Sequence, residues 1–216
     1  MDRREAVLRE MNLYPTWVRR ETAEAPLPEA HPSCMDWPEL KEKVKGCTLC
    51  PLRAGCRQTV FGVGNEKAQW LFVGEAPGAE EDAKGEPFVG QAGRLLDNML
   101  LAIGLKREEV YIANVVKCRP PSNRQPHAGE MAACLPYLEN QIALIQPKII
   151  VALGRTAASA LLNTDQPISA LRGIVHEHRG IPVVVSFHPA YLLRTPLDKA
   201  KSWKDLCLAS ATVGRH

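Results

Sequence analysis

Residues 70–78 read WLFVGEAPG, a short apolar run that ends in a turn rich in glycine and proline. Three more apolar runs follow at residues 110–116, 148–153 and 181–187. Runs that are apolar throughout predict strands covered on both faces. Segments with helical spacing separate them, so the sequence predicts an α/β fold, a three-layer α/β/α sandwich around a mostly parallel sheet of four strands.

The expected helices lie at residues 37–44, 93–103, 130–145, 156–162 and 199–208, and a hairpin-like insert is expected near 171–178. Before the first helix, residues 21–32 are rich in Ala, Glu and Pro, as in an extended linker. We therefore predict an N-terminal appendage over residues 1–33, one domain over 34–209 and a C-terminal tail over 210–216.

Composition places the chain among ordinary globular proteins. Its 216 residues are 45% apolar and 24% charged, which excludes a collagen, a coiled coil and a wholly disordered chain. The net charge of +3 is too small to indicate which partners the protein binds. The apolar stretches are too short to span a membrane, and residues 1–5 are charged without an apolar segment after them. We expect a cytoplasmic monomer that does not bind membranes.

Polar side chains gather where the predicted strands end. Glu75 follows the first strand, Asn114 lies in the second, and His188 follows the fourth. Ligands of open α/β sheets bind beyond the carboxyl ends of the strands, so we expect these three side chains to converge on one site.

These residue types match one kind of chemistry. The amide of Asn114 offers donors and an acceptor to the edge of a planar heterocycle. His188 can donate to an oxygen that gains negative charge, and Glu75 can hold a water or stabilise a cationic sugar. Phe88 is either a core anchor or a platform on which a base stacks. Alone, Glu75 could instead cap a helix, Asn114 could bond to loop backbone and His188 could be a turn residue.

The cysteines predict a metal site. Cys47 and Cys50 form a C-x-x-C pair, Cys118 ends the second strand segment, and Cys134 lies on the following helix. Four thiolates suit either a [4Fe–4S] cluster or zinc, and the single close pair favours the cluster. Cys56 is a possible substitute ligand. Disulfides are not expected in a reducing compartment.

Basic residues accompany the same segments. Arg53 follows the C-x-x-C pair, Lys117, Arg119 and Arg124 follow the second strand, and Arg194 follows the fourth. A solvated charged face would look the same, but the position beside the candidate site favours contact with phosphates.

Three motifs carry a family resemblance: GEAPG at 74–78, NVVKCRPP at 114–121 and HPAYLLR at 188–194. They resemble the motifs of the family 4 uracil-DNA glycosylases, the iron–sulfur-containing group of that superfamily. The resemblance extends over residues 37 to 208. It implies an α/β/α sandwich that removes uracil from DNA.

The resemblance also implies a role for each matching residue. Glu75 would activate or position water, His188 would act at uracil O2, and Asn114 would read the uracil edge. Phe88 would stack on uracil, Glu81 would exclude the thymine methyl group, and Gly74 and Ala76 would complete the uracil site. The remaining implied or predicted residues are the wedge, Leu192 or Leu193; the DNA contacts Arg53, Arg119, Arg124 and Arg194; and the cluster ligands Cys47, Cys50, Cys118 and Cys134.

The expected activity is thus a DNA repair glycosylase that flips uracil out of DNA and hydrolyses its N-glycosidic bond, leaving an abasic site. Two alternatives remain. One is a relative that bonds covalently to uracil-DNA, and the other is a non-catalytic DNA-binding protein stabilised by a metal. The covalent relative carries Gln after Gly-Glu, where this chain has Ala76, and a different loop at 121–126, so hydrolysis is favoured.

Overall fold

The computed structural model describes residue 10 and residues 35–214. The predicted appendage over residues 1–33 therefore lies almost wholly outside the described residues, and its boundary stays a prediction. Within the described part of the chain, no helix is both long and apolar enough to cross a bilayer.

The centre of the fold is a parallel sheet made from the four predicted strands. In spatial order these are β3 (Tyr111–Asn114), β2 (Trp70–Gly74), β4 (Ile149–Leu153) and β6 (Ile181–Ser186). All three pairings between them are parallel. The four expected strands and their parallel arrangement are confirmed.

The sheet has six strands rather than four, so the predicted number was wrong. The extra strands β1 (Val63–Gly64) and β5 (Val175–His178) pair antiparallel at the two edges, and β5 is the predicted hairpin-like insert. β1 is two residues long and gives no hydrophobic pattern. A side chain at Gly64 would collide with the Val110 carbonyl, so this edge pairing requires glycine.

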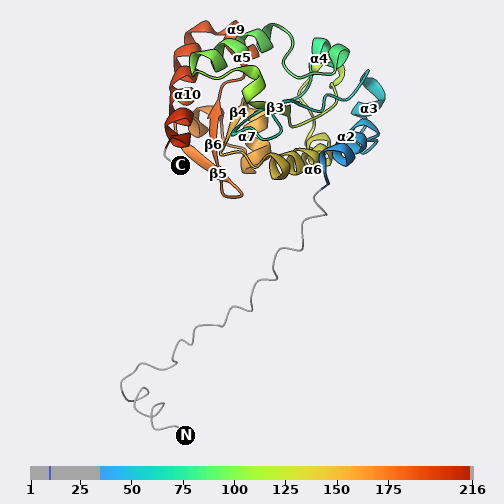
Figure 1. Ribbon diagram of the computed structural model, residues 1–216, viewed down its shortest axis with the longest axis horizontal. Coiled ribbons are helices and arrows are strands. Elements are labelled where there is room, and N and C mark those ends of the chain that lie inside the picture. Colours follow the sequence, from blue (N-terminus) through green and yellow to red (C-terminus); the bar gives the residue numbers. More distant parts are fainter. Residues whose placement is uncertain (1–9, 11–34, 215–216) are drawn as a thin grey trace. The chain divides into compact units, whose positions relative to one another are not determined.

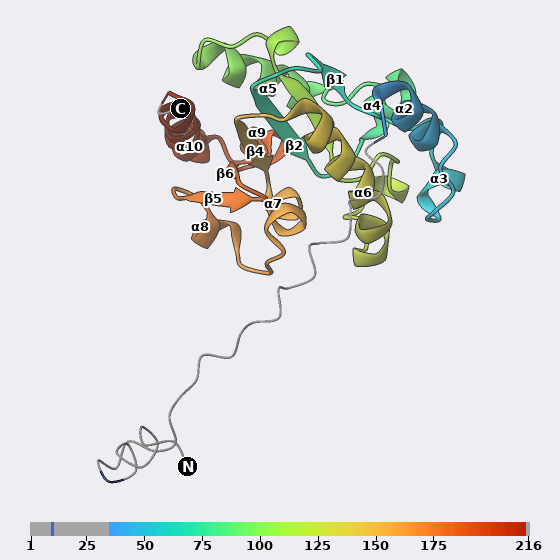
Figure 2. The same cartoon turned by 60° about the horizontal axis from the view of Figure 1, so that its bottom comes forward.

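Helices cover both faces of the sheet, which confirms the three layers (Figures 1 and 2). Leu71 and Val73 of β2 pack with α6 (Ala128–Ile145) and α7 (Arg155–Leu162). Phe72, between them, packs with α5 (Gln91–Ala102), α9 (Pro189–Arg194) and α10 (Lys199–Val213). A strand that is apolar throughout thus supplies two cores, because successive side chains point to opposite faces.

The other elements are short, and the longest of them, α2, has nine residues. The structure has α2 (Trp37–Lys45), α3 (Leu52–Gly55), α4 (Ala79–Lys84), α8 (Ile168–Leu171) and 3₁₀ turns at Arg107–Glu109, Pro121–Asn123 and Pro196–Asp198. The last helix continues to Val213 rather than ending at Leu208. Residues 210–213, expected in a tail, are therefore helical.

Candidate active site

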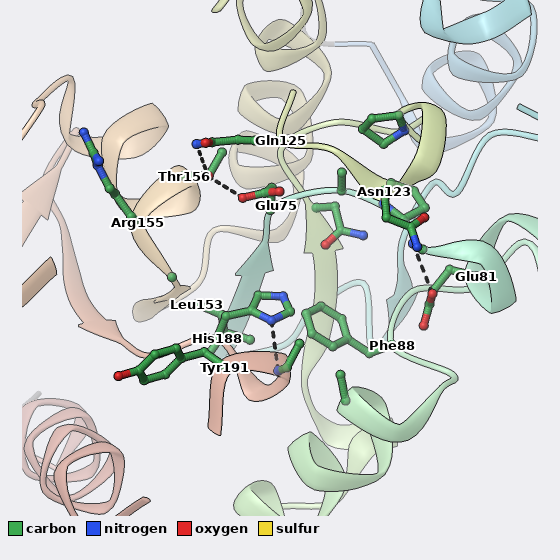
Figure 3. Close-up of a pocket in the computed structure, with 18 of the residues that line it drawn as sticks. Glu75, Glu81, Phe88, Asn123, Gln125, Leu153, Arg155, Thr156, His188 and Tyr191 are labelled. Atoms are coloured by element: carbon green, nitrogen blue, oxygen red, sulfur yellow. Dashed lines mark hydrogen bonds between the residues drawn. The ribbon is translucent and has the colours of Figure 1, made fainter. Parts of the chain in front are cut away.

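A cavity of 610 Å³ opens at the carboxyl ends of the parallel strands (Figure 3). Glu75 follows β2, Asn114 ends β3, and His188 caps α9 after β6. All three side chains line this cavity, together with Phe88 and Glu81. The predicted convergence is confirmed, because parallel strands deliver their following residues to the same edge of the sheet.

Asn114 presents an unpaired hydrogen-bond acceptor to the cavity. Asn114 is only 2% exposed, and its Oδ1 is buried without a hydrogen-bond partner. Gly74 is its register partner on β2, and an added Cβ there would collide with both Asn114 Oδ1 and the Phe88 ring. The glycine thus lets the amide and the ring approach each other. A buried acceptor without a donor is costly, which indicates that a ligand supplies the donor.

His188 is neutral, with its protonation state fixed by its surroundings. Burial first, and then nearby Arg194, lower its pKa from 6.5 to about 4, while Glu81 acts in the opposite direction. The Ala190 N–H donates to Nδ1 over 3.1 Å. Because Nδ1 accepts, the ring proton lies on Nε2, and His188 can donate only from that atom.

Phe88 adopts a backbone conformation that non-glycine residues rarely take, with φ at 54°. The Glu81 carboxylate stabilises the turn that follows it. Glu81 Oε1 accepts from the amides of Val89 at 3.0 Å and Gly90 at 3.2 Å, and Oε2 accepts from the Gly78 amide at 3.1 Å. Both carboxylate oxygens are therefore used to shape the Phe88 wall of the cavity. The role of Glu81 against a thymine methyl group stays a prediction.

Glu75 is held by residues that the sequence analysis missed. The hydroxyl of Thr156 donates to Glu75 Oε2, and Gln125 Nε2 donates to Thr156 Oγ1 at 3.0 Å (Figure 3). Thr156 lies two residues beyond Gly154, at the carboxyl end of β4, so the strand-end rule could have marked it. Gln125 lies in an irregular loop and has no sequence signal.

The predicted basic residues do not form one cluster. Arg124 and Arg194 line the cavity, as does exposed Arg155, which the sequence analysis missed. Arg119 Nε instead donates to Asn123 Oδ1 at 2.8 Å, and Arg53 lies beside the cysteines described below. Their contacts with DNA stay predictions.

The two wedge candidates have opposite surroundings. Leu192 is 1% exposed and packs in the core with α5 and α10, whereas Leu193 is 41% exposed. In this conformation a duplex can reach only Leu193. Leu192 is therefore a core residue, and its predicted contact with DNA is wrong for this conformation.

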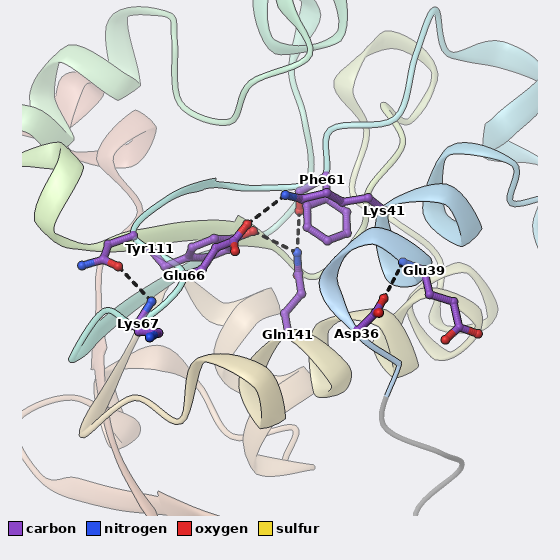
Figure 4. A network of polar contacts seen from close by, with 9 residues as sticks. Asp36, Glu39, Lys41, Phe61, Glu66, Lys67, Tyr111 and Gln141 are labelled. Atoms are coloured by element: carbon purple, nitrogen blue, oxygen red, sulfur yellow. Dashed lines mark hydrogen bonds and ion pairs between the residues drawn. The ribbon is translucent and has the colours of Figure 1, made fainter.

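Lys117, expected to contact phosphates, is instead buried at 1% exposure. Its Nζ donates to the Asn114 carbonyl at 2.9 Å and to Gln141 Oε1. Gln141 also donates from Nε2 to the Phe61 carbonyl at 3.0 Å (Figure 4). Burial lowers the pKa of Lys117 to about 8. The prediction failed because the side chain turns inward, to the Asn114 carbonyl and Gln141, and not to the surface.

The four predicted cysteine ligands line one small cavity between α2, α3 and α6. All of them are free thiols, and Cys56 is buried close by. Burial raises the pKa of Cys118 and of Cys134, while the Lys117 amide donates to Cys134 Sγ at 3.2 Å. Across residues 35–214, no three Cys, His, Asp or Glu side chains are already set to hold one metal ion.

Comparison with known proteins agrees with this geometry. The profile of the "Uracil DNA glycosylase superfamily" matches residues 61–211. A type-4 uracil-DNA glycosylase of Thermotoga maritima is 49% identical over 177 residues, covering 76% of this chain and 92% of the relative. One of Archaeoglobus fulgidus is 46% identical over 166 residues, covering 73% and 83%.

A third relative, the type-4 uracil-DNA glycosylase of Pyrobaculum aerophilum, is 42% identical over 182 residues, covering 81% of this chain and 93% of its own length. Residues 61–211, which the superfamily model matches, contain the cavity and the whole sheet. The three-layer fold, the converging strand-end residues and these relatives lead to one conclusion: the chain belongs to the uracil-DNA glycosylase superfamily, in its type-4 group.

Proposed function

We propose that this protein is a uracil-DNA glycosylase of DNA repair, which hydrolyses the N-glycosidic bond of a uracil flipped out of DNA. The observation that carries the proposal is the buried, unpaired Oδ1 of Asn114, a residue that lines the cavity together with Phe88, His188 and Glu75. The type-4 relatives, named for this activity, support it.

Base recognition follows from the amide and the ring. Uracil N3–H donates to Asn114 Oδ1, which has no other partner, and the Asn114 NH₂ group donates to uracil O4. Phe88 stacks on the base face. Cytosine presents an acceptor at N3 and an amino group at position 4, so the same amide orientation would oppose it.

Bond cleavage places negative charge on the departing base. His188 donates from Nε2 to uracil O2 as that oxygen becomes anionic, and it does so as a neutral imidazole because its pKa is about 4. Its ring centroid lies 5.5 Å from that of Phe88, and both side chains border the cavity that would hold the base.

The sugar becomes cationic in the same step, and Glu75 supplies the opposite charge. Oε2 of Glu75 accepts from Thr156, which leaves Oε1 to accept from the attacking water. The water adds at C1′ as the base departs, and its proton passes to solvent or to the base anion. The products are free uracil and an abasic site.

A [4Fe–4S] cluster held by Cys47, Cys50, Cys118 and Cys134 is favoured over zinc, because structural zinc sites more often use two close pairs and only Cys47 and Cys50 form one here. All four thiols line one cavity, as one shared site requires. The Lys117 amide bond to Cys134 Sγ is typical of a ligating thiolate. Bound, the cluster would link α2, α3 and the segment after β3 as a structural element, since hydrolysis transfers no electrons.

DNA reaches the cavity over a basic rim. Arg124 and Arg194 line the cavity, and Leu193 is exposed one residue before Arg194. We infer that Leu193 fills the space that uracil leaves in the stack, as apolar wedges do elsewhere. Arg53 and Arg119 contact the backbone further along.

One gel tests the activity. A labelled oligonucleotide with a single uracil is incubated with the protein, and half of each sample is treated with alkali. Alkali-dependent cleavage at uracil, with none in the matched thymine strand, supports hydrolysis. A shifted band that resists denaturation indicates covalent trapping, and an intact unshifted strand indicates a protein that only binds. Either of the last two outcomes would overturn the proposal.

A further inference from the structure

We propose that Thr156 and Gln125 are positioning residues, which fix the Glu75 carboxylate and link it to the loop that faces DNA. The inference rests on the proposed function and extends it. Neither residue belongs to the three motifs that carry the family resemblance, and neither contacts the base in the scheme above.

The three side chains come from three different segments. Glu75 follows β2, Thr156 lies in the first turn of α7, and Gln125 lies in the loop between β3 and α6. Figure 3 shows them in a row on one side of the cavity, with Thr156 between the other two. A row built from three segments forms only when the fold is complete, so it reports the relative placement of β2, α7 and the loop.

The direction of the hydrogen bonds follows from donor counting. Gln125 Nε2 donates to Thr156 Oγ1 at 3.0 Å, so that oxygen acts as an acceptor. The hydroxyl has one proton, and the carboxylate of Glu75 can only accept, so the proton points to Oε2. The amide polarises the hydroxyl and strengthens its bond to the carboxylate.

Thr156 cannot easily release Glu75. It is 4% exposed, and its neighbours Ala157 and Ala158 are fully buried in the same helix turn. A buried, β-branched side chain has few alternative rotamers. The carboxylate, which lines the cavity, is therefore held through Oε2. Without this hydroxyl, Glu75 would rotate in a cavity open to water.

The loop that supplies Gln125 is held in a strained conformation. Ser122 and Asn123 have φ of 54° and 55°, which L-residues seldom adopt. Two pairs hold the loop: Arg119 with Asn123, and Arg124 with Glu130 through two bonds of 2.9 and 2.7 Å.

Such strain persists where the surrounding structure determines the conformation fully. The loop thus carries two arginines proposed to meet DNA and, at the next residue, the amide that contacts Thr156. Two hydrogen bonds, through Thr156, thus connect Glu75 to this loop.

The test compares single-turnover excision by Thr156→Val, Thr156→Ser, Gln125→Ala and the double variant Gln125→Ala/Thr156→Val. Thr212→Val, whose hydroxyl donates to the Leu208 carbonyl on α10, is the matched control. Duplex affinity is measured separately by binding, and folding by thermal unfolding.

We expect Thr156→Val to lower the maximal rate by about 10- to 100-fold, the effect of a hydrogen bond to a charged group, with duplex affinity unchanged. Thr156→Ser should recover most of the rate, and Gln125→Ala should cost about threefold. The double variant should be no slower than Thr156→Val, because Gln125 acts only through the hydroxyl.

If the wild type excises uracil and folded Thr156→Val does so at the same rate, this inference is overturned while the proposed function stands. Additive losses in the double variant, or loss of affinity rather than rate, would also contradict it. Should Thr156→Val fail to fold, Thr156→Ser and Gln125→Ala still decide: an unaltered rate in Gln125→Ala, or a rate in Thr156→Ser no higher than expected for Thr156→Val, overturns it. A wild-type protein that excises no uracil contradicts the proposed function instead.

Discussion

The rings of Phe88 and His188 stack with their centroids 5.5 Å apart and an angle of 28° between their planes. They come from positions 100 residues apart in the sequence, one in a turn before α5 and the other at the cap of α9. Both rings line the cavity. One contact between these two rings therefore positions both the Phe88 surface proposed to stack on the base and the His188 donor proposed to bond to its oxygen.

Replacing Gly74 with Ala should disrupt this arrangement. The new methyl group would collide with Asn114 Oδ1 and the Phe88 ring, so both must move. We expect a loss of about 1–3 kcal/mol in the free energy of unfolding and about a hundredfold loss in excision rate. Gly129→Ala, which has open space around it, is the control and should retain both. Equal rates in the two variants would contradict the close contact at Gly74.

The free energy of unfolding should depend on pH through the protonation of His188. Its pKa is about 4 in the folded protein and 6.5 when unfolded, so between these values the unfolded chain binds more protons. The native state should therefore lose stability as pH falls from 6.5 to 4, by at most about 3 kcal/mol from this group. The contribution is fully present above pH 6.5.

Denaturant titrations of wild type and His188→Gln at several pH values isolate this effect. The difference between the two free energies should change through that window and stay flat above pH 7. A flat difference throughout would show that His188 titrates normally, which would contradict its desolvation.

The adjacent leucines should behave in opposite ways. Leu192→Ala removes a core side chain and should cost about 2–5 kcal/mol in the free energy of unfolding. Leu193→Ala should leave stability unchanged within about 0.5 kcal/mol and slow excision from duplex about tenfold. Excision from single-stranded DNA, which needs no wedge, should not slow. Equal slowing on both substrates would contradict the wedge.

Metal content should depend on the four proposed ligands, Cys47, Cys50, Cys118 and Cys134, and not on the other cysteines. Cys118→Ser and Cys134→Ser should lower iron and acid-labile sulfide and reduce visible absorption in anaerobic preparations. Cys207→Ser, which is exposed on α10, is the control. Cys56→Ser should also keep its iron, because Cys56 does not line the cavity that holds the other four. Stoichiometric zinc in place of iron would contradict the cluster.

The parallel strands and the convergence of Glu75, Asn114 and His188 were predictable, because burial on both faces leaves continuous apolar runs and strand ends share one edge. The edge strand at Val63–Gly64 was not, since its pairing depends on a close backbone approach rather than on side-chain pattern. Lys117 was misjudged because sequence position does not reveal that its chain turns inward.

Thr156 and Gln125 show a further limit of sequence reasoning. Their significance lies in hydrogen bonds between three segments, and no local pattern specifies which loop residue will meet which helix turn. The choice between Leu192 and Leu193 likewise required knowing which side of α9 packs on the core.

A crystal structure of the protein with its product uracil tests the central claim most directly. We predict uracil on the Phe88 ring, with N3–H donating to Asn114 Oδ1 and His188 Nε2 within hydrogen-bond distance of O2. Uracil bound elsewhere, or in this cavity with Asn114 Oδ1 still unpaired, would contradict the account.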